Sequence, residues 1–138
     1  MGNTSPIWSK VGDVQWGSAA IKDGNIDKTG VATGATLVFT ADATNGGYVQ
    51  KIRFRSAGTN VATVGRVFIN DGTDHTVSTA NILYDEITLA ATTVSETSAL
   101  PTYELSLNIA LPPTYRLYVT IGTAVAAGYF VTVIGGKY

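Results

Sequence analysis

The sequence predicts an all-β protein: one single-domain antiparallel β-sandwich of about eight strands, jelly-roll-like, with a small closed β-barrel as the alternative. Three observations lead to this prediction. Two stretches alternate apolar and polar residues with a period of two, which is typical of half-buried antiparallel strands. Turn signals recur along the chain, and no stretch has a convincing helical pattern. The length of 138 residues suits one domain with a proper core.

The two clearest strands cover residues 103–111 and 115–122. Every second residue from Tyr103 to Leu111 is apolar, and the same holds from Tyr115 to Ile121. Between them, Pro112-Pro113 lacks two backbone donors and therefore predicts a turn. We expect these two strands to pair with each other as a hairpin.

Six further strands are expected, and turn signals punctuate them. The signals are Gly30, "NGG" at 45–47, "NDG" at 70–72 and "GG" at 135–136. The Thr- and Ser-rich stretch 91–101 predicts a surface loop. Residues 1–13 have no strand pattern and predict an extended N-terminal arm, which leaves 14–138 as the folded domain. The six strands are expected near 14–20, 35–41, 48–56, 64–70, 82–89 and 128–136.

The composition disfavours several classes of function. The net charge is −1 and the pI about 5.6, so the excess of positive charge that polyanion binders use is missing, and no nucleic-acid partner is expected. There is no cysteine, which excludes disulfides and thiolate metal sites. No segment resembles a secretory signal or a transmembrane helix, and no membrane partner is expected.

The single histidine restricts the catalytic chemistry that the chain can offer. His75 lies in the turn "NDGTDHT", where we interpret Asp71 and Asp74 as turn-capping residues and not as calcium ligands. No serine stands in a nucleophile elbow. Asp85 and Glu86 are adjacent in a strand, so they point to opposite faces and cannot cooperate as acid and base. We expect a protein that is not an enzyme, with no cofactor and no metal.

The stretch "KIRFRS" places three cations on one face of a strand. Lys51, Arg53 and Arg55 are spaced by roughly 6.6–6.8 Å, a distance set by the backbone rise. A nucleic-acid reader would need aromatic residues on that face for stacking, whereas Phe54 lies on the opposite one. We interpret the row as a solvated edge strand whose charges discourage sheet pairing. An ionic contact to a protein partner and a contact to nucleic acid are the alternatives.

Two apolar segments do not fit the half-buried pattern. The stretch "YFVTVI" at 129–134 is apolar on both faces, so this strand is either central to the core or covered by a partner. The N-terminal arm carries a tryptophan that either folds back on the core or is covered by a partner surface. The candidate residues for an oligomer interface are Phe130, Val131, Val133 and Ile134.

Several segments carry a resemblance to a known family. With "PIW", "VFTA", "IRFRSAGTN", "RVFINDG" and "GTAVAAGYFVTVIGGKY", the chain resembles small tailed-bacteriophage proteins encoded near the major capsid protein. Several of these look like head decoration (cement) proteins. The resemblance covers residues 6–138 and is most recognisable at 52–72 and 122–138. No catalytic residues are carried over with it.

The resemblance implies a virion structural protein that binds the outside of the capsid as a trimer and reinforces it. The implied partners are the major capsid protein and further copies of the chain, and the implied location is the outer capsid surface, after synthesis in the host cytoplasm. The candidate capsid contacts are Pro6, Ile7, Trp8, Lys51, Arg53 and Arg55. The alternative function is a tail-fibre or receptor-binding module that recognises surface glycans through Tyr84 and Tyr118.

Overall fold

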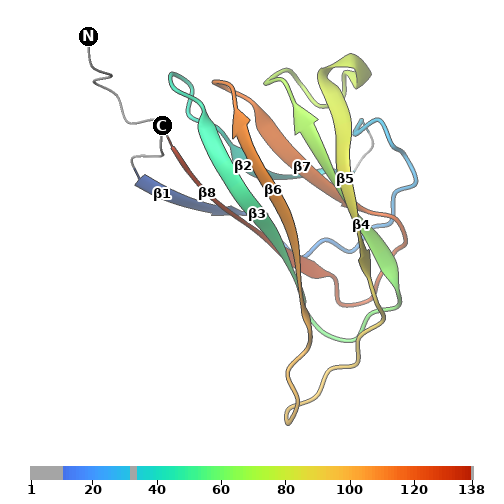
Figure 1. The fold of residues 1–138 in the computed structure, drawn as a ribbon. Coiled ribbons are helices and arrows are strands. Elements are labelled where there is room, and N and C mark those ends of the chain that lie inside the picture. Colours follow the sequence, from blue (N-terminus) through green and yellow to red (C-terminus); the bar gives the residue numbers. More distant parts are fainter. Residues whose placement is uncertain (1–10, 32–33, 138) are drawn as a thin grey trace.

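The computed structural model, which describes residues 11–31 and 34–137, contains two four-stranded antiparallel sheets that face each other (Figure 1). The strand order is β1-β8-β3-β6 in sheet A and β2-β7-β4-β5 in sheet B. The prediction of an all-β sandwich is thereby confirmed. The elements are β1 (Val11–Trp16), β2 (Thr36–Thr40), β3 (Gly47–Ser56), β4 (Thr63–Asn70), the 3-10 helix η1 (Ser78–Ala80), β5 (Asn81–Leu89), β6 (Thr102–Leu111), β7 (Arg116–Ile121) and β8 (Tyr129–Lys137).

The pairing of the strands is that of a jelly roll. In sheet A, β1 pairs with β8 and β3 pairs with β6; in sheet B, β2 pairs with β7 and β4 pairs with β5. Strands therefore pair from the two ends of the chain inward, as in one long hairpin wrapped around the sandwich. This topology gives the eight strands of a jelly roll, and two separate sheets take the place of the closed barrel considered as the alternative.

The expected hairpin between the strands around 103–111 and 115–122 is wrong. A turn does follow Pro112, but β7 pairs with β2 and β4, so the chain crosses from sheet A to sheet B at this point. The physical reason lies in the core. Leu107 of β6 and Leu117 of β7 belong to the same buried cluster, which the two strands cover from opposite sheets.

The first strand also differs from its expected position. β1 spans 11–16 instead of 14–20, because the chain bends shortly after Trp16. Gly17, which follows the strand, donates its backbone N–H to the carbonyl of Val131 in β8. Residues 11–13 of the expected N-terminal arm therefore belong to sheet A. Residues 1–10 lie outside the described residues.

The core lies between the sheets and explains the alternation in the sequence. In β7, the side chains of Leu117, Val119 and Ile121 are completely buried in this cluster. From sheet A, Ile52 and Phe54 of β3 are buried in it as well. In these two strands, alternate residues thus enter the core and the residues between them lie on the outer face of the sheet.

Two connections pack on the outer face of sheet B. In the β1–β2 connection, Asn25 donates its backbone N–H to the carbonyl of Ile121, at 2.7 Å. Gly30 has a φ of 75° and approaches Phe68 so closely that a Cβ would lie 3.1 Å from its ring, a position that glycine alone fills without strain. The segment 71–80 brings His75 against Tyr118, with ring centroids 4.8 Å apart. Sheet A instead presents its outer side chains as a surface.

Candidate interaction surface

A row of three cations runs along the outer face of β3, as the sequence predicted. Ile52 and Phe54 are fully buried, whereas Lys51, Arg53 and Arg55 lie on the opposite side of the strand. The interpretation of this strand as an edge is wrong, because β3 pairs with β8 on one side and with β6 on the other. The charges therefore decorate the middle of a sheet and do not protect an edge.

Glu104 on β6 neutralises part of this row. Its carboxylate accepts hydrogen bonds from Lys51 Nζ at 2.9 Å and from Arg53 Nη2 at 2.7 Å, which hold the pKa of Glu104 below its usual value. Arg55 instead donates to the carbonyl of Leu100 at 3.0 Å and to Thr102 Oγ1 at 2.7 Å. Among the described residues, Arg55 has no carboxylate partner, so the row retains positive charge.

Apolar side chains lie beside the cationic row on the same face of sheet A. Trp16 is 68% exposed and Phe130 is 51% exposed. Phe130 stands directly opposite Arg55 in the register of β8 and β3, and Val14 stands opposite Ile134 in that of β1 and β8. We call these four apolar residues, Val14, Trp16, Phe130 and Ile134, the outer patch.

The outer patch contains only two of the four residues predicted for an oligomer interface. Phe130 and Ile134 lie on the outer face of β8. Val131 and Val133 are 1% and 0% exposed and pack in the chain's own core, so their assignment to an interface is wrong. The reason is that β8 is a central strand of sheet A, between β1 and β3, and one of its faces covers the core. The predicted contacts Pro6, Ile7 and Trp8 lie outside the described residues.

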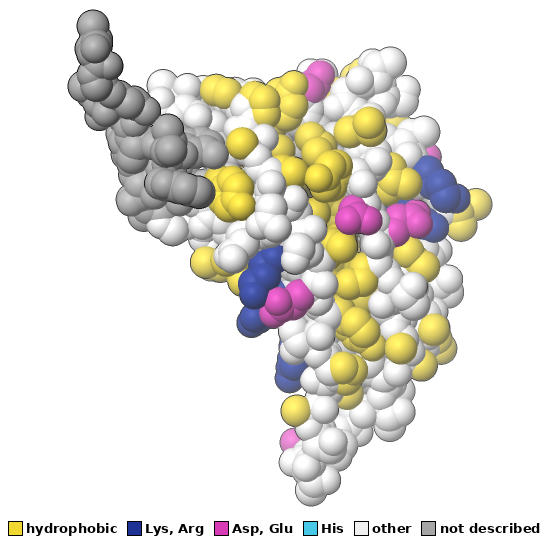
Figure 2. Space-filling model, viewed as in Figure 1, with side chains coloured by type: hydrophobic (Ala, Val, Ile, Leu, Met, Phe, Trp, Pro, Cys, Tyr) yellow, Lys and Arg dark blue, Asp and Glu magenta, His cyan; other side chains and the backbone are white. Residues whose placement is uncertain are grey.

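A second apolar surface lies where the sandwich is open, between the edge strands β5 and β6. Figure 2 shows hydrophobic side chains in a stripe along this gap. Ile87 of β5 and Tyr103, Leu105 and Ile109 of β6 pack against the core but are only half-buried. Ile82, which pairs with the core-packed Ile69, is 64% exposed. We call this surface, made of Ile82, Ile87, Tyr103, Leu105 and Ile109, the seam.

On the opposite side of the sandwich, a side-chain amide bridges the edge strands of the two sheets. Gln15 of β1 donates from Nε2 to the carbonyl of Thr40 in β2, at 3.0 Å. Its Oε1 accepts from the backbone N–H of the same residue, at 2.8 Å. The amide thus imitates a neighbouring strand and satisfies both backbone groups at an edge of sheet B. The other two edge strands, β5 and β6, border the seam.

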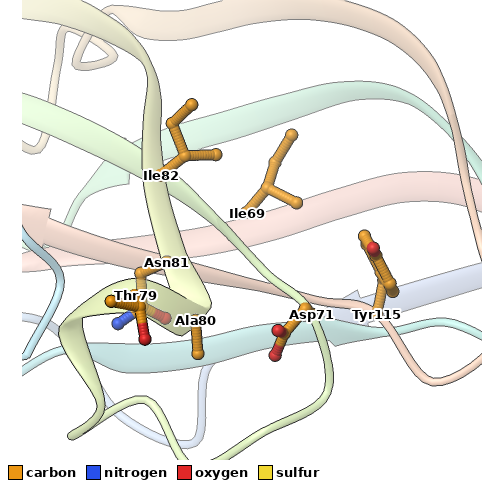
Figure 3. A pocket seen from close by; sticks show the side chains of 7 residues that line it. All are labelled: Ile69, Asp71, Thr79, Ala80, Asn81, Ile82 and Tyr115. Carbon is orange, nitrogen blue, oxygen red and sulfur yellow. The ribbon is translucent and has the colours of Figure 1, made fainter.

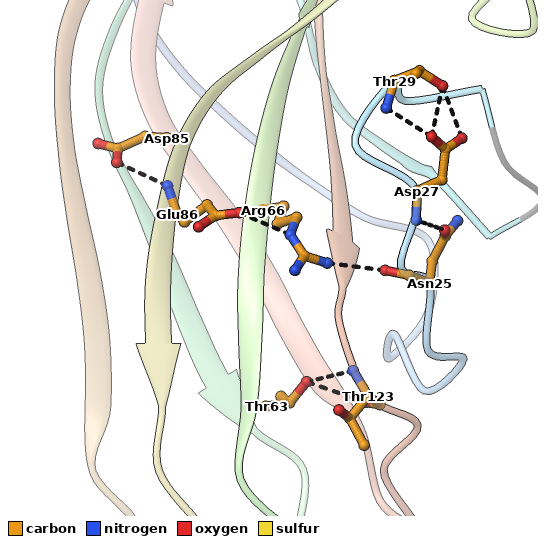
Figure 4. A network of polar contacts seen from close by, with 8 residues as sticks. All are labelled: Asn25, Asp27, Thr29, Thr63, Arg66, Asp85, Glu86 and Thr123. Atoms are coloured by element: carbon orange, nitrogen blue, oxygen red, sulfur yellow. Dashed lines mark hydrogen bonds and ion pairs between the residues drawn. The ribbon is translucent and has the colours of Figure 1, made fainter.

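A polar network positions two carboxylates on opposite sides of β5 (Figure 4). Arg66 donates to Glu86 Oε1 at 2.9 Å and to the carbonyl of Asn25 at 3.0 Å, which ties the β1–β2 connection to sheet B. Asp85 points away from Glu86 and accepts only the backbone N–H of that residue, at 2.8 Å. The sequence-based prediction that these two carboxylates face apart is confirmed. Asp85 has no cationic partner within the described residues.

The turn around His75 has the capping geometry expected from the sequence. Asp71 Oδ1 accepts the backbone N–H of Thr73 at 2.9 Å, and Asp74 Oδ1 accepts that of Thr76 at 3.0 Å. Hydrogen bonds from the Thr73 hydroxyl and backbone lower the pKa of Asp71. The backbone N–H and then the hydroxyl of Thr76 lower the pKa of Asp74.

The proposed aromatic platform for glycans is only half present. Tyr118 is buried beneath His75 and cannot stack on a sugar, which corrects that expectation, while Tyr84 is exposed. A pocket of ≈ 180 Å³ lies at the start of β5, the strand that carries Tyr84 (Figure 3). Its amide group, Asn81, is already bonded to Asn70 and to the carbonyl of His75. The pocket is lined by Ile69, Asp71, Thr79, Ala80, Asn81, Ile82 and Tyr115.

Within residues 11–31 and 34–137, no group of three or more His, Cys, Asp or Glu side chains is arranged to hold a metal ion. None of the described helices has the length and apolar character needed to cross a membrane. Comparison of the chain with protein-family models, with curated proteins and with solved structures gives no match.

Sequence reasoning missed the seam and half of the outer patch. The alternation of Val14, Gln15 and Trp16 was a signal for the patch, but it fell inside a strand whose position was misjudged. The seam had no local signal at all. Its residues read as core positions, and only the topology makes β5 and β6 edge strands whose inner faces are not fully covered.

Proposed function

We propose that the chain is a non-enzymatic virion structural protein that binds the outside of a tailed-phage capsid as a homotrimer and reinforces it. The observation that carries this proposal is the outer face of sheet A, where Arg53 and Arg55 stand beside the exposed Trp16 and Phe130. A face with both apolar and cationic groups suits protein–protein contact, because aromatic and Arg side chains are enriched at interfaces.

Two further points support the proposal. The resemblance to small phage proteins spans residues 6–138, which includes every strand of the jelly roll. The jelly roll is also an architecture that viral capsid domains use, although the same fold serves other functions. A trimer engages a capsid through three copies at once, so modest contacts by each copy add up to firm attachment.

The test is the location of the chain in the particle. Virions of the phage that encodes it are disrupted, and heads and tails are separated. Mass spectrometry then measures the ratio of the 14.4 kDa chain to the major capsid protein in each fraction. We expect abundance in heads near one copy per capsid subunit. A few copies confined to tails would favour the glycan-recognising fibre module instead, and absence from both fractions would overturn a virion role.

A capsid contact made by the cationic row would depend on charge and on salt concentration. If Lys51 and Arg53 face the capsid, replacing both with Gln weakens attachment of the purified protein to heads that lack it. Added salt then weakens attachment of the unmodified protein, because it screens the charges. The matched control is Lys28→Gln, which removes an exposed cation from the β1–β2 connection. Equal attachment of all variants at every salt concentration would rule out the row as a capsid contact.

A further inference from the structure

Two unlike apolar surfaces lie at opposite edges of the same sheet. The outer patch belongs to β1 and β8, and the seam is bordered by β6, which is the far edge strand in the order β1-β8-β3-β6. The outer patch projects from the sheet, with Trp16 and Phe130 more than half exposed. The seam is the open side of the sandwich, where inner side chains are incompletely covered.

The charges beside the two surfaces are complementary. Arg55 stands opposite Phe130 in the register of sheet A and has no carboxylate partner among the described residues. Asp85 lies two residues from Ile87 on β5 and likewise has no cationic partner among the described residues. Since Arg66 occupies Glu86 on the other face of β5, Asp85 is the carboxylate of this pair that remains available to a second molecule.

We propose that the outer patch of one copy packs into the seam of the next copy, with Arg55 of the first facing Asp85 of the second. This inference rests on the proposed homotrimer and names the surfaces that form it. The contact is head-to-tail, because it joins two different surfaces, and a head-to-tail contact that closes produces a ring. Burial of Trp16 and Phe130 supplies the apolar driving force, and the ion pair fixes the register.

The arrangement divides the cationic row between two tasks. Arg55 is assigned to the contact between copies. Lys51 and Arg53, which share Glu104, remain on the surface for the capsid. The assignment therefore predicts that substitutions at the two ends of one row have different consequences, one for assembly and the other for attachment to heads.

A charge exchange tests the contact. The masses of purified Arg55→Glu, Asp85→Arg and the double variant are measured by light scattering after gel filtration over a range of concentrations. The unmodified chain is expected to have three times its 14.4 kDa mass. Each single change is expected to weaken assembly by about tenfold or more, because like charges then meet, and the double variant is expected to recover most of it. Lys28→Glu, an exposed change of the same sign, serves as the control.

The apolar half of the contact is tested with exposed residues, so that folding is not at risk. Trp16→Ser and Phe130→Ser are expected to give folded monomers, with unchanged far-UV circular dichroism. The control Ile26→Ser removes a side chain that is 84% exposed, outside both surfaces, and is expected to leave the trimer intact.

The outcomes separate this inference from the proposed function. A trimer that persists in all four single variants, or a double variant that assembles no better than Arg55→Glu alone, overturns the inference and leaves a capsid role in place. A monomeric unmodified chain overturns both the contact and the trimer. Attachment to the capsid is decided independently, by the abundance of the chain in heads.

Discussion

Replacing Asn60 with alanine removes a buried amide that joins two loops at one end of the sandwich. Asn60 is 3% exposed. Its Oδ1 accepts the backbone N–H groups of Ala127 at 2.8 Å and Gly128 at 2.9 Å. Its Nδ2 donates to Ser56 Oγ and to the carbonyl of Gly128, both at 2.9 Å. The amide thus uses both of its donor hydrogens and both acceptor positions of its oxygen.

The magnitude follows from the groups that lose a partner. The carbonyl of Gly128 still accepts the N–H of Ala57, and Ser56 Oγ still donates to the carbonyl of Gly58. The N–H groups of Ala127 and Gly128 lose their acceptor. The buried N–H of Gly128 left unsatisfied costs about 1–3 kcal/mol and the half-buried N–H of Ala127 costs less, so we expect a loss of about 3 kcal/mol in the free energy of unfolding. Such a loss is a large share of the about 5–15 kcal/mol that stabilises a typical domain.

The assay is urea unfolding followed by far-UV circular dichroism, with calorimetry for the melting temperature. At about 3–4 °C per kcal/mol for a chain of this size, the melting temperature should fall by about 9–12 °C. The matched control is Asn45→Ala in an exposed turn, which we expect to change stability by no more than about 0.5 kcal/mol. A loss at Asn60 of less than about 1 kcal/mol would refute the reasoning, because the amide would then be dispensable.

Three further changes test other parts of the fold. Thr120 Oγ1 is buried and has no hydrogen-bond partner among the described residues, so Thr120→Val should leave stability in urea unchanged or raise it by about 1 kcal/mol. Val131→Asp places an unpaired charge in the core, and we expect no folded protein by circular dichroism. Hydrogen bonds from Lys51 and Arg53 lower the pKa of Glu104. These ion pairs therefore stabilise the fold above the ordinary pKa of glutamate, and their contribution is lost as the pH falls through the lowered pKa, so Glu104→Gln should show a smaller loss of stability in acid.

Each of these expectations has a contrary result. A loss of more than about 1 kcal/mol in Thr120→Val would mean that the hydroxyl has a partner after all. A soluble, folded Val131→Asp variant would place that side chain outside the core. An acid unfolding profile of Glu104→Gln identical to that of the unmodified chain would mean that the ion pairs with Lys51 and Arg53 contribute nothing to stability.

The sequence predicted the local structure well because the period-two pattern reports directly on burial. The alternation of Lys51, Ile52, Arg53 and Phe54 placed the cations outside and the apolar side chains inside, and the structure confirms this arrangement. The capping aspartates in the turn at 70–76 were predicted for a similar reason, since their hydrogen bonds are made to residues close in sequence.

The neighbours of each strand could not be predicted in the same way, because pairing is decided by contacts between distant residues. The misjudged hairpin at Pro112-Pro113 and the supposed edge position of β3 are errors of this kind. The seam was missed for the same reason. Leu105 has the same local pattern as Leu107 and lies on the same edge strand, yet Leu107 is buried and Leu105 is only half-buried.

Electron cryomicroscopy of heads with and without the chain tests directly whether it decorates the outside of a capsid as a trimer. We expect additional threefold density on the outer surface in heads that carry the chain, of a size that accommodates three jelly rolls. Identical outer surfaces in the two maps, with the chain recovered elsewhere in the particle, would overturn the proposed function.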